Sequence, residues 1–189
     1  MSVSGKPLLY HLFDRFPQTN FITIGDRLYE VLEKYLDTIV PSVPVKLIRA
    51  KEKGTLGGVK EALTLLPDDD VPFLLIWSDL LFEKIPDIEI TDRNVIGLSR
   101  SFKCRWSYSD TNVCQEEPSS ERGIAGFFMF QNRRCLGDIP ASGECVRWLA
   151  KQRMQFDVVF LDDVYEIGTL DALSKYQRTC KAMTNCCPE

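Results

Sequence analysis

Two short stretches of the sequence hold residues whose types and order could do chemistry. The segment Gly54-Thr55-Leu56-Gly57-Gly58 stands before apolar residues at helical spacing. Glycines let a backbone approach a ligand closely, and a helix N-terminus offers free N–H groups to an anion. Further on, an apolar run from Phe73 ends on a carboxylate, Asp79. At the carboxyl end of a strand in an α/β sheet, this side chain could hold a metal or a substrate hydroxyl.

The same residues also fit a plainer interpretation. The glycines could form an ordinary turn before an ordinary helix, and Asp79 could cap a loop after its strand. Taken alone, the two stretches leave both interpretations open.

Alternating strands and helices must position these residues. The apolar patterns predict strands near 20–24, 45–49, 73–78, 94–98, 124–131 and 156–161. They predict helices near 7–16, 25–36, 59–66 and 143–150, and a last helix from Leu170 with Thr169 as its N-cap. This alternation is typical of an α/β protein with a largely parallel sheet.

The bulk properties fit one domain over residues 1–189, with 180–189 as a flexible tail. The net charge of −4 argues against a nucleic-acid partner. No apolar run approaches the ~20 residues that span a bilayer, and the N-terminus lacks the apolar core of a signal peptide. The seven cysteines form no CxxC pair, which favours reduced thiols and a cytoplasmic location.

Six segments, in order along the chain, resemble the motifs of one family. They are Gly5-Lys6-Pro7-Leu8-Leu9, Gly54-Thr55-Leu56-Gly57-Gly58, Ile76-Trp77-Ser78-Asp79, Glu116-Glu117-Pro118, Gly123–Phe130 and Glu166–Leu173. Together they resemble the nucleotidyltransferases that activate sugar 1-phosphates, the nucleotide-sugar pyrophosphorylases, whose fold the bacterial choline-phosphate cytidylyltransferases share. The resemblance implies a three-layer, Rossmann-like fold around a mixed, mostly parallel central sheet.

The resemblance also implies an activity. A nucleotidyl group would pass from a nucleoside triphosphate to a sugar 1-phosphate or similar phospho-acceptor, releasing pyrophosphate with the help of magnesium. Asp79 and Glu166 would be the catalytic carboxylates and the metal ligands, because Mg²⁺ commonly takes one or two carboxylates plus phosphates. Glu166 stands where the family more often has Asp, and an acid near a helix N-terminus also has a purely structural explanation.

The remaining implied contacts divide between the two substrates. Gly54, Thr55, Gly57 and Gly58 would bind the nucleotide, and Glu116, Gly126 and Arg105 would bind the acceptor, a phosphorylated sugar or alcohol. An arginine beside an aromatic ring, as in Arg105-Trp106, suits a phosphate, although a solvated surface arginine is the plainer interpretation. No nucleic acid or membrane is expected as a partner, and a homo-oligomer is one option.

One motif of the family has no counterpart. Its first apolar strand and its Gly-x-Gly-x-Arg loop, which cradles the triphosphate, are missing from the sequence. Whether the chain is an active enzyme therefore stays open, and the alternative is a catalytically incomplete binding or regulatory domain that needs another segment or chain. A glycosyltransferase of related fold is disfavoured because Leu80 and Leu81 follow Asp79 in place of an Asp-x-Asp.

Overall fold

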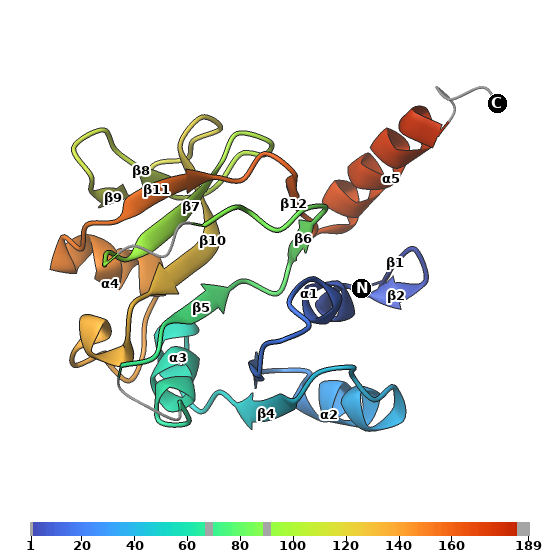
Figure 1. The fold of residues 1–189 in the computed structure, drawn as a ribbon, viewed down its shortest axis with the longest axis horizontal. Coiled ribbons are helices and arrows are strands. Elements are labelled where there is room, and N and C mark those ends of the chain that lie inside the picture. Colours follow the sequence, from blue (N-terminus) through green and yellow to red (C-terminus); the bar gives the residue numbers. More distant parts are fainter. Residues whose placement is uncertain (1, 67–69, 89–91, 185–189) are drawn as a thin grey trace.

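A mixed sheet lies on the side of the molecule away from α5, at the left of Figure 1. The computed structural model describes residues 2–66, 70–88 and 92–184. Within them this sheet has six strands: β5 (Phe73–Ile76), β7 (Val95–Ser99), β8 (Ser107–Tyr108), β9 (Cys114–Gln115), β10 (Gly123–Phe130) and β11 (Asp157–Phe160). The long strand β10 is antiparallel to β5, β7 and β8.

The expected predominance of parallel pairs is therefore not met in this sheet. Among its described strands, β11 and β7 make the one parallel pair, and β8 and β9 are antiparallel. The physical reason is β10, which lies between β5 and β7 and runs opposite to both. The fold is mixed α/β.

Three smaller ladders accompany the sheet. Strands β1 (Ser2–Val3) and β2 (Lys6–Pro7) form an antiparallel hairpin. Strands β3 (Phe21–Gly25) and β4 (Val45–Arg49) are parallel, as expected for strands joined through a helix. Strands β6 (Leu80–Phe82) and β12 (Val164–Glu166) are antiparallel.

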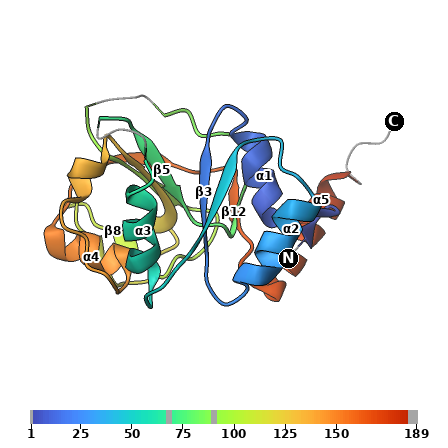
Figure 2. The same cartoon turned by 90° about the horizontal axis from the view of Figure 1, so that it is seen from below.

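Five α-helices are described: α1 (Leu8–Arg15), α2 (Tyr29–Thr38), α3 (Thr55–Leu63), α4 (Cys145–Gln152) and α5 (Leu170–Thr184). A 3-10 turn, η1, covers Arg133–Leu136. Figure 2 shows α3 and α4 on one side of the molecule and α1, α2 and α5 on the other. Among the described residues, no helix has the length and apolar character to cross a membrane.

Helix boundaries confirm one prediction and correct another. The Thr169 hydroxyl accepts a hydrogen bond from the Ala172 N–H at 3.1 Å, which is the predicted N-cap. Helix α3 begins at Thr55, so Gly57 and Gly58 lie inside the helix and not in a turn before it. Helix α5 runs to Thr184, and 185–189 lie outside the described residues, so the flexible tail expected at 180–189 stays a prediction.

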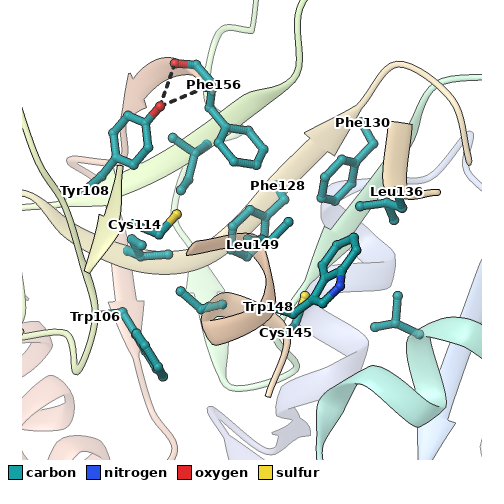
Figure 3. Packing of buried hydrophobic residues seen from close by; sticks show 14 of the residues in the cluster. Trp106, Tyr108, Cys114, Phe128, Phe130, Leu136, Cys145, Trp148, Leu149 and Phe156 are labelled. Atoms are coloured by element: carbon teal, nitrogen blue, oxygen red, sulfur yellow. Dashed lines mark hydrogen bonds between the residues drawn. The ribbon is translucent and has the colours of Figure 1, made fainter. Parts of the chain in front are cut away.

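Both faces of the central sheet are buried. On one face Phe128 and Phe130 of β10 join the cluster that α3 and α4 cover (Figure 3). On the other face Phe127 joins a second cluster with Leu12 of α1 and Phe82 of β6. Successive side chains of a strand point to opposite faces, which explains why a strand buried on both faces reads as a continuous apolar run.

Candidate functional site

The β6–β12 ladder brings Asp79 and Glu166 together. Asp79 directly precedes β6, and Glu166, the last residue of β12, pairs with Leu80. The Ile167 N–H donates a hydrogen bond to the Asp79 carbonyl at 2.8 Å, which extends the ladder by one step. The two predicted carboxylates therefore stand at the same end of one short ladder.

Gly168 lies at the point where the two carboxylates converge. Its N–H donates to Glu166 Oε1 at 2.7 Å. A Cβ atom at Gly168 would lie 2.4 Å from Glu166 Oε1 and 2.9 Å from Asp79 Oδ2. A methyl group at this position would force the carboxylate ends to move, a constraint that the motif resemblance did not specify.

The environment of Asp79 disfavours an isolated negative charge. Its Oδ1 atom is buried and has no hydrogen-bond partner among the described residues. Burial first, and then the negative charge of Glu166, raise the pKa of Asp79 above its ordinary value. A bound cation would stabilise this pair because it would neutralise the repulsion and give the orphaned oxygen a ligand bond.

The donor set fits magnesium. The described part of the chain contains no group of three or more His, Cys, Asp or Glu residues placed to hold a metal. The donors that converge near Gly168 are the two carboxylates of Asp79 and Glu166. Mg²⁺ is typically bound by one or two carboxylates together with phosphate oxygens and water, whereas structural zinc sites use four protein ligands. Asp79 and Glu166 are thus suited to an ion that arrives with a phosphorylated ligand.

Gly126 supports the segment that links β5 to Asp79. Its φ angle is +85°, and a Cβ atom there would lie 2.1 Å from the ring of Trp77. The Trp77 N–H donates to the Gly126 carbonyl at 2.9 Å, at a shift in the β10 register between Ile124 and Phe127. Glycine at 126 is therefore required by the indole two residues before Asp79, and its predicted contact with an acceptor stays a prediction.

The Gly54 turn is anchored to the start of helix α4. A Cβ atom at Gly54, whose φ is +85°, would lie 2.4 Å from the Gly143 carbonyl oxygen. The Leu56 N–H donates to that oxygen at 2.9 Å, and the Thr55 hydroxyl accepts from the Cys145 N–H at 2.7 Å. One N–H of the first turn of α3 is thereby occupied within the protein.

Gly57 and Gly58 allow close packing around α3. A Cβ atom at Gly57 would lie 2.7 Å from the Ala141 carbonyl oxygen, and one at Gly58 would lie 2.4 Å from Ile24 Cγ2 of β3. These contacts give both glycines a packing explanation that sequence alone did not suggest. A nucleotide contact by this segment is still a prediction.

A second charged group lies over Trp106. Glu116 accepts hydrogen bonds from Arg147 Nε at 3.2 Å and from Arg105 Nη2 at 3.4 Å. Both guanidinium carbons lie over the Trp106 ring, at 5.5 Å for Arg105 and 5.7 Å for Arg147. Arg147, assisted by Arg105, holds the pKa of Glu116 below its ordinary value.

Sequence reasoning selected Arg105 and Glu116 but missed Arg147. The missing signal is the packing of α4 against β9, which brings residue 147 beside residue 116 from thirty-one positions away. No local pattern around Arg147 could have indicated that contact.

Cys104 is a buried thiol that directly precedes Arg105 in the chain. Burial, with a smaller contribution from the charge of Glu166, raises the pKa of the Cys104 thiol to about 12. The thiol is therefore neutral near pH 7 and lies within electrostatic reach of Glu166, while Arg105 follows it in the chain. Gly123 accommodates the sulfur closely, since a Cβ there would lie 2.6 Å from Cys104 Sγ.

Comparisons with known proteins place this arrangement in a known fold. No protein-family model matches the chain, and no curated protein matches its sequence. Among solved structures, HddC from Yersinia pseudotuberculosis matches with a TM-score of 0.74 and 19% identity, over 97% of this chain and 88% of that one.

Two further structures match over a similar extent. The CTP:phosphocholine cytidylyltransferase LicC from Streptococcus pneumoniae gives a TM-score of 0.68 and 12% identity, over 95% of this chain and 87% of that one. The inositol-1-phosphate CTP transferase from T. maritima gives a TM-score of 0.64 and 14% identity, over 96% of this chain and 85% of that one. The resemblance drawn from the sequence motifs is confirmed at the level of structure: the chain has the fold of the sugar-phosphate and CTP nucleotidyltransferases.

Proposed function

We propose that the protein is a magnesium-dependent nucleotidyltransferase. It would transfer a nucleotidyl group from a nucleoside triphosphate to a sugar 1-phosphate or a similar phospho-acceptor and release pyrophosphate. The observation that supports this most directly is the convergence of Asp79 and Glu166 on Gly168, with one Asp79 oxygen buried and without a hydrogen-bond partner in the described part of the chain. HddC has been crystallised with GMP-PN, and two other structural matches are named as CTP-dependent transferases, which fits this class of substrates.

Each part of the site has a role in this proposal. Asp79 and Glu166 would hold Mg²⁺, which supplies positive charge to the triphosphate when bound. The Gly168 N–H keeps the Glu166 carboxylate oriented toward Asp79. The Gly54–Gly58 segment would contact the nucleotide, and Gly126, Glu116 and Arg105 the acceptor. The setting would be nucleotide-sugar or phospho-alcohol metabolism in a cytoplasm, by a monomer or a homo-oligomer.

A thermal-shift panel tests the proposal. ATP, CTP, GTP, UTP and dTTP are added with and without Mg²⁺, and a ligand at 100 times its Kd should stabilise the protein by about 2.7 kcal/mol. For a domain of this size, that is a rise in Tm of roughly 5–11 °C. A rise with one nucleotide that requires Mg²⁺ and is absent in Asp79→Ala supports the site, and a rise that survives the substitution contradicts the metal assignment.

A second candidate is a catalytically incomplete domain that binds or regulates and needs another segment or chain. The absence of a Gly-x-Gly-x-Arg loop from the sequence favours it, because that loop cradles the triphosphate in the family the motifs resemble. Pyrophosphate release separates the two candidates. Turnover by the chain alone with any nucleotide and phospho-acceptor contradicts the second, whereas turnover only after another polypeptide is added contradicts the first.

A further inference from the structure

A cavity of about 400 Å³ lies at the end of the six-stranded sheet that is opposite to Asp79. The first residues of β7 and β11, Val95 and Asp157, pair with each other, and Val95 also pairs with Met129 near the end of β10. Asp79 instead follows the last residue of β5, which pairs with Phe127. The cavity is therefore separate from the pair of carboxylates in the candidate site.

The walls of this cavity come from loops that flank the strands. Arg93 and Asn94 directly precede β7, Gln131 directly follows β10, and Gln155 lies between α4 and β11. Asn112, in the turn of the β8–β9 hairpin, lines the cavity as well. Three of these five side chains are exposed, so a ligand could enter from the solvent.

Hydrogen bonds hold the walls in place without a ligand. The Gln131 N–H donates to Asn94 Oδ1 at 3.0 Å, and Gln131 Nε2 donates to the Arg93 carbonyl at 2.6 Å. The Tyr108 hydroxyl ties the β8–β9 hairpin to the N–H and the carbonyl of Phe156, at 2.8 Å and 3.3 Å (Figure 3). A pre-formed cavity costs a ligand less ordering free energy than a flexible one.

Three carboxamides of the lining keep hydrogen-bonding capacity. The side chains of Asn112 and Gln155 make no hydrogen bond within residues 2–66, 70–88 and 92–184, and Gln131 Oε1 accepts none there. A carboxamide both donates and accepts hydrogen bonds, and so does a hydroxyl group. Several carboxamides around one cavity therefore suit a ligand that carries several hydroxyl groups.

The charges of the lining argue against a phosphorylated ligand. Arg93 is the one basic residue among the lining residues, and its Nη1 atom lies 3.5 Å from Asp157 Oδ1. Asp92 also lines the cavity, so the lining has two acidic residues for one basic residue. A phosphate would meet repulsion from these carboxylates, whereas a neutral ligand would not.

We propose that this cavity binds a neutral polyhydroxylated molecule of the size of a monosaccharide or a cyclitol. Its volume lies within the range of small-molecule pockets. A ligand of about twelve non-hydrogen atoms that is held by a few hydrogen bonds should have a Kd of roughly 1 mM. The proposal goes beyond the transferase activity, and it needs neither the metal nor the nucleotide.

Alkylation of Cys135 by iodoacetamide tests binding at this place. The partly buried Cys135 thiol lies in the cavity wall, whereas the other fully described cysteines, Cys104, Cys114 and Cys145, are buried. D-glucose, D-mannose, D-galactose and myo-inositol are the probes, each at about 10 mM, and digestion with mass spectrometry reports the rate at Cys135. Glutathione alkylated in the same solution corrects for effects of the probe on the reagent.

A ligand at about ten times its Kd should slow the alkylation of Cys135 by roughly tenfold, because only the unoccupied protein reacts. At least one of the four probes should have this effect. The same protection is expected in Asp79→Ala, so the result does not depend on the proposed metal site. An unchanged alkylation rate with all four probes would overturn the proposal.

Two glutamine variants test the role of the carboxamides. Gln155→Ala should weaken the protection by the active probe roughly five- to tenfold, because it removes a hydrogen-bonding group from the cavity. Gln152→Ala is the matched control, since Gln152 is exposed at the end of α4 and does not line the cavity. Both variants should keep the Tm of the wild type. Equal protection in the two variants contradicts the assignment of Gln155.

A phosphorylated sugar tests the charge of the ligand. D-glucose 1-phosphate at the same concentration should leave the alkylation rate of Cys135 unchanged, because the lining has more acidic than basic residues. A molecule bound near Asp79 would lie at the other end of the sheet and would not cover Cys135. Stronger protection by D-glucose 1-phosphate than by the neutral probes would contradict the proposed ligand class.

Discussion

Replacement of Asp79 by asparagine should stabilise the protein in the absence of metal and nucleotide. The substitution keeps the shape of the side chain but removes a charge that burial and Glu166 both disfavour. If Asp79 had a structural role, its replacement would be neutral or would lower the stability of the protein. A gain in stability would therefore identify Asp79 as a group kept for binding at a cost to the fold.

The size of the gain follows from the environment of the carboxylate. A buried polar group without a partner costs about 1–3 kcal/mol. Asparagine still leaves an oxygen near the same position, so only the charge-dependent part is recovered, about 1 kcal/mol. For a chain of this length, that corresponds to a rise in Tm of about 2–4 °C.

The pH dependence of stability is a second test of whether Asp79→Asn stabilises the protein. The pKa of Asp79 is higher in the folded state than in the unfolded state, so the unfolded state loses this proton first as the pH rises. The charge on Asp79 therefore costs stability at pH 8, and this cost disappears as the pH falls toward the ordinary carboxylate range, near 4. The Tm difference between variant and wild type should be largest at pH 8 and should approach zero at about pH 4.

Differential scanning fluorimetry between pH 4 and 8, without divalent cations, measures both quantities. Asp162→Asn is the matched control, because Asp162 is exposed and also follows a strand of the sheet. It should leave the Tm unchanged. A variant at Asp79 that is less stable than the wild type at pH 8, or a Tm difference that does not change with pH, would refute the reasoning.

Two further predictions concern the scaffold. Gly126→Ala should lower the free energy of unfolding by roughly 2 kcal/mol more than Gly137→Ala does. Both positions have positive φ, but only a methyl group at 126 would clash with Trp77. Equal losses of unfolding free energy in urea denaturation would contradict this. Tyr108→Phe should cost about 1–3 kcal/mol, because the hydroxyl accepts from the Phe156 N–H at 2.8 Å and donates to its carbonyl at 3.3 Å (Figure 3). An unchanged urea midpoint would show that water replaces that hydroxyl.

Much of the fold could be predicted because buried strands and helix ends leave local patterns of apolar and capping residues in the sequence. The apolar runs at 73–76, 95–99 and 157–160 are strands, and the last helix begins at Leu170 with Thr169 as its cap. Strand direction could not be predicted in the same way. An apolar run that is buried on both faces has the same composition whether its neighbours are parallel or antiparallel, so β10 gave no sign of its orientation.

The candidate site shows the same division. Asp79 and Glu166 were selected by resemblance to a motif, and the structure brings them together through β6 and β12, two strands of three residues that the sequence analysis did not separate from their surroundings. The glycines at 57, 58 and 126 were assigned to ligands, whereas close neighbours within the protein account for each of them. Glycine marks a close approach, but the sequence does not say whether a ligand or another side chain makes it.

The pairing of β6 with β12 also determines when the site can exist during folding. The ladder joins residues 80–82 to residues 164–166, so the carboxylates come from distant parts of the chain. Contacts of such sequence separation require the closure of a long loop and form slowly. We expect nascent chains that have not yet emerged beyond Glu166 to contain Asp79 without its partner. The proposed site for a nucleotide with its metal would then arise only after residues 164–166 have left the ribosome and paired with residues 80–82.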